Sequence, residues 1–363
     1  MANNTTFYGN VSLASPVPWF IWYKTPEDHR LGLLSAYIGI VTLSLLGDIA
    51  LIAVICKYRH LRTKGNYFVL NMAASDIAAL LVLTRSVYIL HSESNAWDIQ
   101  GWPGDILCKL AAFTRDITIS VSIQSMVFLA LNRYVAVVYP ARPPPVILRP
   151  QVAIPFIWVA GFATFGVYFR VYRIEVMYGE IYCFNRWEPP FDPSTGQRNF
   201  YIMFMITQFF IPLPLMTVIY IAIALNLKRQ VIPGEQLPEN ERRQRKRNKN
   251  AVLMAAAIVG SFAVCWAPQH TFELLQWRGA LSDLKFEEYV YIHNTVVVMT
   301  YASFVINPLI CFMFTEGLRK ALKQMLTCGC FLNSTWIEPS KTMETSLNLR
   351  TRQRHDETVN EDG

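Results

Sequence analysis

The stretch Tyr289–Phe314, YVYIHNTVVVMTYASFVINPLICFMF, runs for 26 residues without a formally charged side chain. At about 1.5 Å per residue, a helix of this length crosses the ~30 Å hydrocarbon core of a bilayer. Six further apolar stretches contain few charges; they cover residues 31–56, 67–90, 106–138, 152–169, 200–227 and 251–275. The sequence therefore predicts an all-α membrane protein, a bundle of seven transmembrane helices.

The composition supports this fold class. Of the 363 residues, 53% are hydrophobic and 16% are charged, whereas soluble domains average about 25% charged residues. This balance excludes a disordered, collagen-like or small disulfide-stapled protein. A soluble bundle with buried helices is disfavoured because uncharged runs of this length are rare in water-soluble folds. A membrane β-barrel is disfavoured because the runs do not alternate with period two.

The basic residues predict the orientation. The three loops at residues 57–66, 139–150 and 228–250 contain fourteen Lys and Arg, against six in the alternating loops. The positive-inside rule therefore places the first set in the cytoplasm and the N-terminus outside, in the plasma membrane. Three glycosylation sequons, at Asn3, Asn4 and Asn10, agree with an exterior N-terminus. The net charge of +7 is attributed to contact with anionic membrane lipids, not to nucleic acid.

Four segments follow from this orientation. Residues 1–30 form an extracellular tail, 31–314 the bundle, 315–330 a short amphipathic eighth helix in the cytoplasm, and 331–363 a disordered cytoplasmic tail. No cleavable signal peptide is visible at the start of the chain. Cys108 and Cys183 both face the oxidising exterior and can pair as a disulfide. Cys328 and Cys330 follow the amphipathic stretch and are candidates for palmitoylation.

Polar side chains inside the predicted spans call for an explanation, because a carboxylate in mid-bilayer costs about 2.5–3.5 kcal/mol. The spans contain two central carboxylates and three nearby oxygen donors; these are Asp48, Asp76, Ser122, Ser303 and Asn307. Together they predict a small wet site for a monovalent cation, here sodium, or for a shared proton. The alternative is that they only hydrogen-bond to one another and bind the helices together.

Motifs in the same order on the same spans resemble the rhodopsin-like (class A) family of G protein-coupled receptors, over about residues 31–326. The main motifs are the second-span NMAASD (71–76), the triplet Asn132-Arg133-Tyr134, the sixth-span FAVCWAP (262–268) and the pair Asn307-Pro308. Single residues that also match are Trp102, Cys108, Trp158, Pro212 and Tyr220.

The resemblance implies a receptor and not an enzyme. Arg133 would meet a heterotrimeric G protein when the sixth span bends at Pro268, and Cys108–Cys183 would hold the second outer loop over the ligand pocket. The implied activation residues are Asn132, Arg133, Tyr134, Tyr220, Phe262, Pro268, Pro308 and Cys311. Arrestin and receptor kinases would be further partners.

Three departures from the family pattern bear on signalling. Asn132 stands where an acidic partner of the arginine is usual, which predicts a weaker restraint on Arg133. Cys311 replaces the closing tyrosine of the seventh-span motif. Asp48 replaces a first-span asparagine and adds a second carboxylate near Asp76, which implies a shared proton or a bound cation.

The ligand follows from the predicted pocket. Retinal requires a seventh-span lysine, and Tyr301 stands there, so no cofactor is expected. Arg115 stands where receptors for amines have an aspartate, which disfavours a protonated amine. The predicted ligand-binding residues are Arg85, Arg115, Asp116, Ile119, Phe204, Trp266, Gln269, His270, Glu273, His293, Val297 and Tyr301. Charges of both signs suit a peptide, and the sixth span resembles that of neuropeptide receptors.

Alternatives remain open at this level. Arg115–Asp116 and Arg85–Glu273 can instead be internal ion pairs that shape an apolar pocket for a lipid. A small anionic ligand paired to Arg115 is the main rival to a peptide. Asn132 and Cys311 also allow a decoy receptor that binds ligand without activating a G protein. A heptahelical transporter is the least favoured, because no internal repeat is evident.

Overall fold

The computed structural model describes residues 27–139, 142–177, 179–193, 195–229 and 239–327. Seven helical spans in these ranges are long and apolar enough to cross a membrane, as the sequence predicts. The first four are α1 (Glu27–Lys57), α2 (Lys64–Ser92), α3 (Gly101–Val138), and α4 (Pro150–Phe165) continued by α5 (Tyr168–Val171). The fifth combines α6 (Gly196–Met205), a π-helical turn η4 (Ile206–Phe210) and α7 (Pro212–Arg229). The last two are α8 (Glu239–Trp277) and α9 (Phe286–Phe314).

The ends of several helices follow from local chemistry. The Thr63 hydroxyl accepts a hydrogen bond from the Asn66 backbone N–H and caps the start of α2. Pro150 occupies the first turn of α4, where its missing N–H costs nothing. The Glu288 carboxylate accepts from the Lys285 N–H at the start of α9. In the fifth span, Pro212 lacks an N–H and the turn before it widens, with Ile211 N–H bonded to the Ile206 carbonyl at 2.9 Å.

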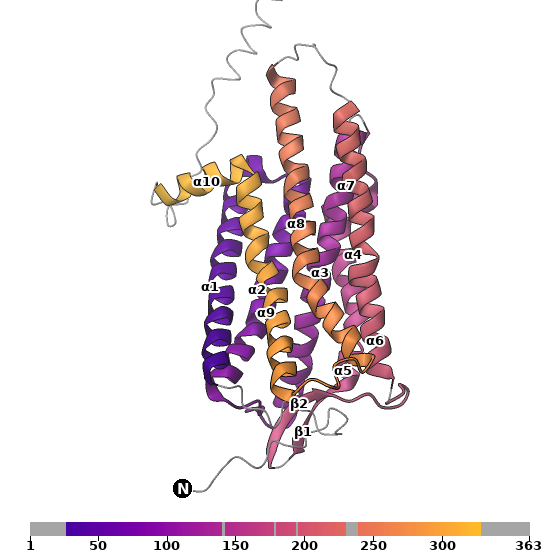
Figure 1. Cartoon of the computed structure of the whole chain (residues 1–363). Coiled ribbons are helices and arrows are strands. Elements are labelled where there is room, and N and C mark those ends of the chain that lie inside the picture. The colour runs from indigo at the N-terminus through magenta and orange to yellow at the C-terminus, as the bar shows by residue number, and fades with distance from the viewer. Residues whose placement is uncertain (1–26, 140–141, 178, 194, 230–238, 328–363) are drawn as a thin grey trace, which may run out of the picture. The chain divides into compact units, whose positions relative to one another are not determined.

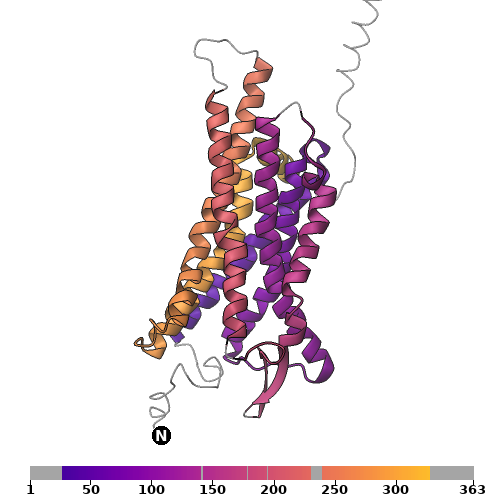
Figure 2. The ribbon, with the colours of Figure 1, turned by 90° about the vertical axis from the view of Figure 1, so that its right-hand side faces the viewer.

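The helix α3 lies at the centre of the bundle and contacts α2, α4, α7 and α8, while α1 packs against α2 and α9 (Figures 1 and 2). The helices α1 and α9 approach closely because Gly47 has no side chain. A Cβ at this position would lie 2.8 Å from the Pro308 ring. The same pair of helices is also joined by the Ser44 hydroxyl, 3.2 Å from the Phe304 carbonyl.

The core of the bundle is largely apolar but contains polar side chains, and the outer faces carry many large apolar side chains. Asp48 and Asp76 are each 1% exposed, whereas Leu81 is 71% and Val264 69% exposed. A soluble fold would expose fewer large apolar side chains, because they gain nothing in water. The outward apolar faces therefore suit contact with lipid.

The second outer loop, residues 170–199, contains secondary structure that the sequence analysis does not predict. It contains a β-hairpin of β1 (Tyr172–Met177) and β2 (Glu180–Asn185), paired antiparallel with Ile174 opposite Cys183. The hairpin lies at the lower end of the bundle in Figure 1 and contacts α3. Its pairing is a tertiary feature, because the segment lacks the Asn-Gly type of turn by which a hairpin is recognised.

The sixth span also extends beyond its predicted start at residue 251. The basic segment 242–249 belongs to α8 and not to a loop. Its Arg, Lys and Gln residues are good helix formers, and they continue the apolar span without a break. A twelve-residue helix, α10 (Glu316–Thr327), follows α9 after Thr315. Shorter turns are η2 (Arg59–Leu61) and η3 (Val146–Leu148).

Candidate functional site: a cavity under the hairpin and a polar cluster below it

A cavity of about 850 Å³ opens at the end of the bundle where the hairpin lies. Ten of the twelve predicted ligand-binding residues line it: Arg115, Asp116, Ile119, Phe204, Trp266, Gln269, Glu273, His293, Val297 and Tyr301. The sequence analysis brought these residues together from four spans. The other two, Arg85 and His270, lie elsewhere.

Arg85 points away from the cavity and holds the first outer loop. Its guanidinium donates to the Ala96 carbonyl at 2.5 Å, lies 3.4 Å from Asp98, and stacks over the Trp97 ring at 4.9 Å. The ion pair Arg85–Glu273 that the sequence allowed is therefore not formed. A long arginine side chain turns toward whichever acceptors lie within its reach, and its position on a helix does not reveal them.

His270 is buried behind the wall of the cavity. It is 3% exposed, and its Nδ1 lies 2.9 Å from the Tyr201 hydroxyl. Its ring lies 4.8 Å from that of Phe209 and 5.9 Å from that of Trp266. The side chain joins α6 and η4 to α8 and takes no place in the lining.

Arg115 and Asp116 form an internal ion pair, which is one of the two alternatives that the sequence analysis leaves open for them. Arg115 Nε lies 2.8 Å from Asp116 Oδ1, and Nη2 lies 3.2 Å from Oδ2. The Tyr168 hydroxyl donates to the same Oδ2 at 2.6 Å. Both oxygens of Asp116 are thus engaged, and the triad ties α3 to α5.

A second ion pair lies at the edge of the same cavity. Arg30 of α1 pairs with Glu93, which follows α2 directly. The sequence analysis did not single out either residue, since both fall at the ends of spans where charges are common. Each arginine in the lining therefore faces a carboxylate within the protein.

Glu273 differs from these two carboxylates. It lies on α8 one turn beyond Gln269, whose amide Nε2 donates to Glu273 Oε1 at 3.1 Å. In the described part of the chain, no Lys, Arg or His nitrogen lies within ion-pair distance of its carboxylate. It is half-buried in the lining of the cavity.

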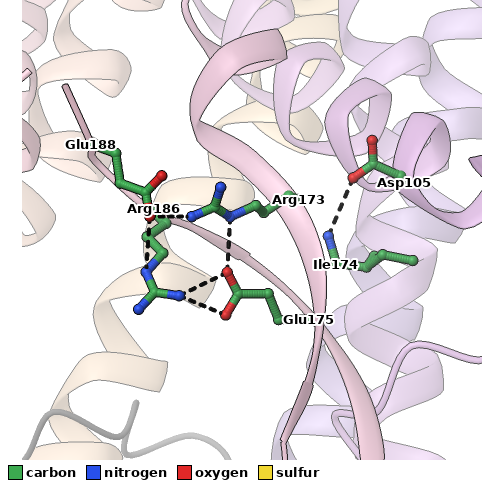
Figure 3. A network of polar contacts seen from close by, with 6 residues as sticks. All are labelled: Asp105, Arg173, Ile174, Glu175, Arg186 and Glu188. Atoms are coloured by element: carbon green, nitrogen blue, oxygen red, sulfur yellow. Dashed lines mark hydrogen bonds and ion pairs between the residues drawn. The ribbon is translucent and has the colours of Figure 1, made fainter. Parts of the chain in front are cut away.

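The hairpin is fastened over the cavity at three points. The disulfide Cys108–Cys183, which the resemblance implies, joins α3 to β2. The Ile174 N–H donates to Asp105 Oδ1 at 3.4 Å (Figure 3), and the Trp97 N–H donates to the Ile181 carbonyl at 2.6 Å. Residues of the hairpin and its flanks complete the lining; they are Tyr172, Tyr182, Asn185 and Trp187.

Two arginines and two glutamates on the hairpin and the segment after it form a closed network of charges (Figure 3). Arg173 contacts Glu175 at 2.8 Å and Glu188 at 2.5 Å, while Arg186 contacts Glu175 at 2.9 Å and Glu188 at 3.4 Å. The hydrogen bond from Arg173 lowers the pKa of the Glu188 carboxyl below its usual value. Because the four charges cancel, this surface presents no net charge to a ligand.

Aromatic rings connect the floor of the cavity to the middle of the bundle. Trp266 packs against Phe262 with ring centroids 5.6 Å apart, and Phe262 packs against Phe209 at 5.8 Å. Phe209 belongs to η4, the widened turn before Pro212. The proline at position 268 lies within α8 between Trp266 and Gln269. A change at the floor therefore has a packed route toward the inner half of α8.

A buried polar cluster lies on the side of these rings that faces away from the outer cavity. Asp76 accepts from the Ser122 hydroxyl at 2.7 Å and from the Asn307 amide at 3.2 Å. Asp48 accepts from the Ser44 hydroxyl at 2.9 Å. Ser303, predicted as a further donor, instead donates to the Thr300 carbonyl at 2.7 Å. The structure thus brings the two carboxylates, Ser122 and Asn307 into the core, but Ser303 bonds to the backbone of its own helix.

The chemistry of this cluster fits a small hard cation or a proton. Asp48 Oδ1 and Asn307 Oδ1 are both buried acceptors without a hydrogen-bond donor among the described residues. A cavity of about 10 Å³ is lined in part by Ser122, Ser303 and Asn307, but by neither Asp48 nor Asp76. Carboxylate, amide and hydroxyl oxygens are the ligands that hard cations prefer, and unpaired buried acceptors are costly unless something satisfies them.

The end of α3 near Arg133 shows which contact Asn132 makes in place of an acidic partner for the arginine. The Asn132 amide donates to the Leu148 carbonyl at 2.8 Å and so ties α3 to η3. Arg133 Nε is buried and has no hydrogen-bond partner in the described ranges, and the same holds for the Tyr220 hydroxyl. The arginine lies against Gly65, where a Cβ would come within 2.5 Å of Nη2.

The remaining activation residues occupy the same inner half. Tyr134 stacks edge-on with Tyr139 at 6.1 Å, Cys311 is 1% exposed, and Pro308 packs on Gly47. The predicted glycosylation residues Asn3, Asn4 and Asn10 and the palmitoylation residues Cys328 and Cys330 lie outside the described residues.

Sequence reasoning missed several contacts. Tyr168 holds Asp116 from 52 positions further along the chain, and no spacing signals such a pair. Trp158 donates to Asn71, whose amide donates to Ser125 at 2.8 Å, a chain that joins α4, α2 and α3. Both residues belong to matched motifs, but their pairing requires the packed helices.

Comparison with known proteins agrees with this geometry. Residues 47–311 match the profile described as 7 transmembrane receptor (rhodopsin family), which is well over half of the chain. Among curated proteins, the neuromedin-K receptor of Homo sapiens is 29% identical over 323 residues, which cover 86% of this chain and 66% of that receptor. The substance-P receptors of Meriones unguiculatus and Rattus norvegicus are each 27% identical over 303 residues, or 83% of this chain and 72% of theirs. The chain thus spans just under two thirds of the human neuromedin-K receptor.

Proposed function

Because the chain belongs to the rhodopsin family of seven-transmembrane receptors, it is a multi-pass membrane receptor and not an enzyme, and we propose that its ligand is an extracellular peptide. The observation that carries this proposal is the cavity of about 850 Å³, which is lined by charges of both signs and by aromatic side chains. Such a volume lies at the upper end for small-molecule pockets. The similarity to receptors named for neuromedin K and substance P supports the same ligand class.

The same proposal includes coupling to a heterotrimeric G protein, with the N-terminus outside the cell. Ligand above Trp266 favours a packing of the ring chain Trp266–Phe262–Phe209 in which α8 bends at Pro268. The inner end of α8 then moves from α3 and uncovers Arg133. The ligand need only bind this state better, since a 100-fold preference is worth about 2.7 kcal/mol.

Arg133 supports this coupling role because the fold leaves its buried Nε without a partner in the described ranges. Asn132, which bonds to Leu148, does not restrain it. We expect the restraint on the inactive state to be weaker than an ion pair would give, and hence measurable basal signalling. Arrestin and receptor kinases are proposed as later partners, with anionic lipids around the basic inner surface.

The test is a signalling screen of cells that express this chain or its Arg133→Ala variant, with an amidated-peptide library and readouts for each G protein class and for arrestin. A peptide that activates a G protein only through the intact Arg133 is the expected result. Arginine-independent activation would contradict the coupling mechanism. Arrestin recruitment without G protein activation would favour a decoy receptor, and responses to lipids or small anions alone would overturn the peptide proposal.

A further inference from the structure

The charges that line the outer cavity do not balance. Its formally charged lining residues are Arg30, Glu93, Arg115, Asp116 and Glu273. Arg30 pairs with Glu93, and Arg115 pairs with Asp116. With histidines neutral, Glu273 is left as the one charge in the lining without an opposite charge from the described residues. The described lining residues therefore have a formal charge of −1, and this charge lies on α8.

The ion pair Arg115–Asp116 is not open to a ligand anion at low cost. Asp116 is bound through both oxygens, by the guanidinium and by the Tyr168 hydroxyl. A ligand carboxylate that took Arg115 would leave a half-buried Asp116 without its cation, and breaking such a pair is costly. The guanidinium is thus already committed, which argues against an anionic ligand as the main occupant.

Glu273 is held by a weaker partner. Among the described residues, its carboxylate has one hydrogen bond, from the neutral amide of Gln269 at 3.1 Å. Replacing a neutral donor by a charged one gives a shorter and stronger bond, about twice as strong in general. A ligand cation gains the interaction without breaking any ion pair of the protein. We propose that Glu273 is the residue that selects a ligand with a cationic group, an ammonium or a guanidinium, in this part of the cavity; this inference rests on the proposed peptide receptor.

The position of Glu273 also places the cation along the ligand. Glu273 lies seven residues beyond Trp266 on the same helix, or about 10 Å along its axis. An extended peptide covers about 3.3 Å per residue. The cationic group therefore belongs about three residues from the part of the peptide that reaches Trp266 at the floor.

The experiment uses four pools of N-acetylated, C-terminally amidated octapeptides, identical except for one residue at a varied position. This residue is Arg, Lys, Glu or citrulline, the uncharged isostere of Arg. Binding to the purified full-length receptor and activation in cells are both measured, on wild type, Glu273→Gln and the control Glu287→Gln. Glu287 is an exposed carboxylate at the start of α9 and lies outside the cavity lining.

We expect the Arg or Lys pool to bind roughly 10- to 100-fold more tightly than the citrulline pool. This difference should disappear in Glu273→Gln and persist in Glu287→Gln. A preference for Arg over Lys would identify the guanidinium as the better partner, and the reverse would identify the ammonium. Charge reversal, Glu273→Lys, should shift the preference to the Glu pool; Glu273→Gln keeps the test decisive if that variant does not reach the cell surface.

Equal binding of the Arg and citrulline pools to wild type, or an unchanged Arg preference in Glu273→Gln, would overturn the inference and leave the peptide receptor standing. Preferential binding of the Glu pool to wild type would also overturn the inference about Glu273, and it would indicate that Arg115 selects the ligand. Binding of none of the pools would overturn the peptide proposal itself, and this inference with it.

Discussion

Buried carboxylates have different partners in the two regions: a cationic partner in the outer cavity and neutral hydrogen-bond donors in the inner polar cluster. In the outer cavity, Asp116 meets a guanidinium and a phenol hydroxyl from the protein itself. In the inner cluster, Asp48 and Asp76 meet hydroxyl and amide donors, and no lysine or arginine of the described ranges pairs with either. The outer ion pair is neutral without a ligand, whereas the two inner carboxylates have a formal charge of −2 that protons or cations must balance. A carboxylate-to-amide substitution should therefore have opposite effects in the two places.

The largest effect is expected from Asp116→Asn. Arg115 would keep its charge without a partner, and the Tyr168 hydroxyl would lose a charged acceptor. We expect the free energy of unfolding to fall by about 2 kcal/mol, less than for a fully buried pair because Arg115 is 41% exposed. Thermal unfolding of the solubilised receptor measures the change. Asp98→Asn is the control, since Asp98 is 59% exposed and pairs with Arg85 only at 3.4 Å. If both variants lost the same free energy of unfolding, the ion pair of Asp116 would be no more important than an exposed one.

We expect Asp48→Asn to raise the free energy of unfolding, the opposite of the effect of Asp116→Asn. The substitution removes one of two buried like charges and puts a neutral amide in place of a carboxylate whose Oδ1 has no hydrogen-bond donor among the described residues. The gain in unfolding free energy should be about 1 kcal/mol. The same unfolding assay, in buffer without sodium, gives the answer. A marked destabilisation would mean that Asp48 is already well satisfied, and that the contrast between the two regions is wrong.

A third effect separates a cation from a proton in the inner cluster. If sodium binds at Asp76, replacing sodium by N-methylglucamine at constant ionic strength should change the affinity of an activating peptide by about fivefold. Asp76→Asn should abolish this dependence, and Asp116→Asn should keep it. Sodium dependence that survives in Asp76→Asn would place the ion elsewhere. Absence of any sodium effect, with a pH effect in its place, would identify the proton.

The smallest effect is expected on the exposed hairpin network. The pKa of Glu188 is lowered by Arg173, so the contribution of this pair is present above the ordinary carboxyl pKa and is lost as the pH falls through the lowered value. In Glu188→Gln, amide exchange in β1 and β2 should rise less than about twofold over wild type at pH 7. The two proteins should exchange alike once the pH lies well below the lowered pKa of Glu188. A large rise would show that surface charges, and not the disulfide, hold the hairpin.

The sequence predicted those features of the molecule that are determined within a single segment, such as the helical spans. Long uncharged runs such as 289–314 are spans in any context, so the seven helices were recovered and only their ends moved. The basic segment 242–249 was taken for a loop because charge suggested exposure, although its residues favour a helix. The hairpin was missed because its pairing depends on contacts with Cys108 and Asp105, which lie far away in the chain.

The lining of the outer cavity was also predictable from single helices, whereas the contacts between its side chains were not. Spacing on helices α3, α6, α8 and α9 placed ten of the twelve residues in the lining, because helical periodicity fixes which residues share a face. The direction of a long side chain is not fixed by periodicity. Arg85 therefore turned to the first outer loop, and the partner of Asp116 proved to include Tyr168, which no pattern connects to it.

The length of α8 has a mechanical consequence. From Pro268 to Glu239 the helix continues for 29 residues without another proline, which is about 44 Å of rod at the rise of an α-helix. A bend of about 10° at this proline would carry the far end through about 7–8 Å by geometry alone. Trp266 lies only two residues from Pro268 on the same side as Glu239, so the same bend would move it by less than the width of a methyl group while the far end moved by the length of a whole side chain.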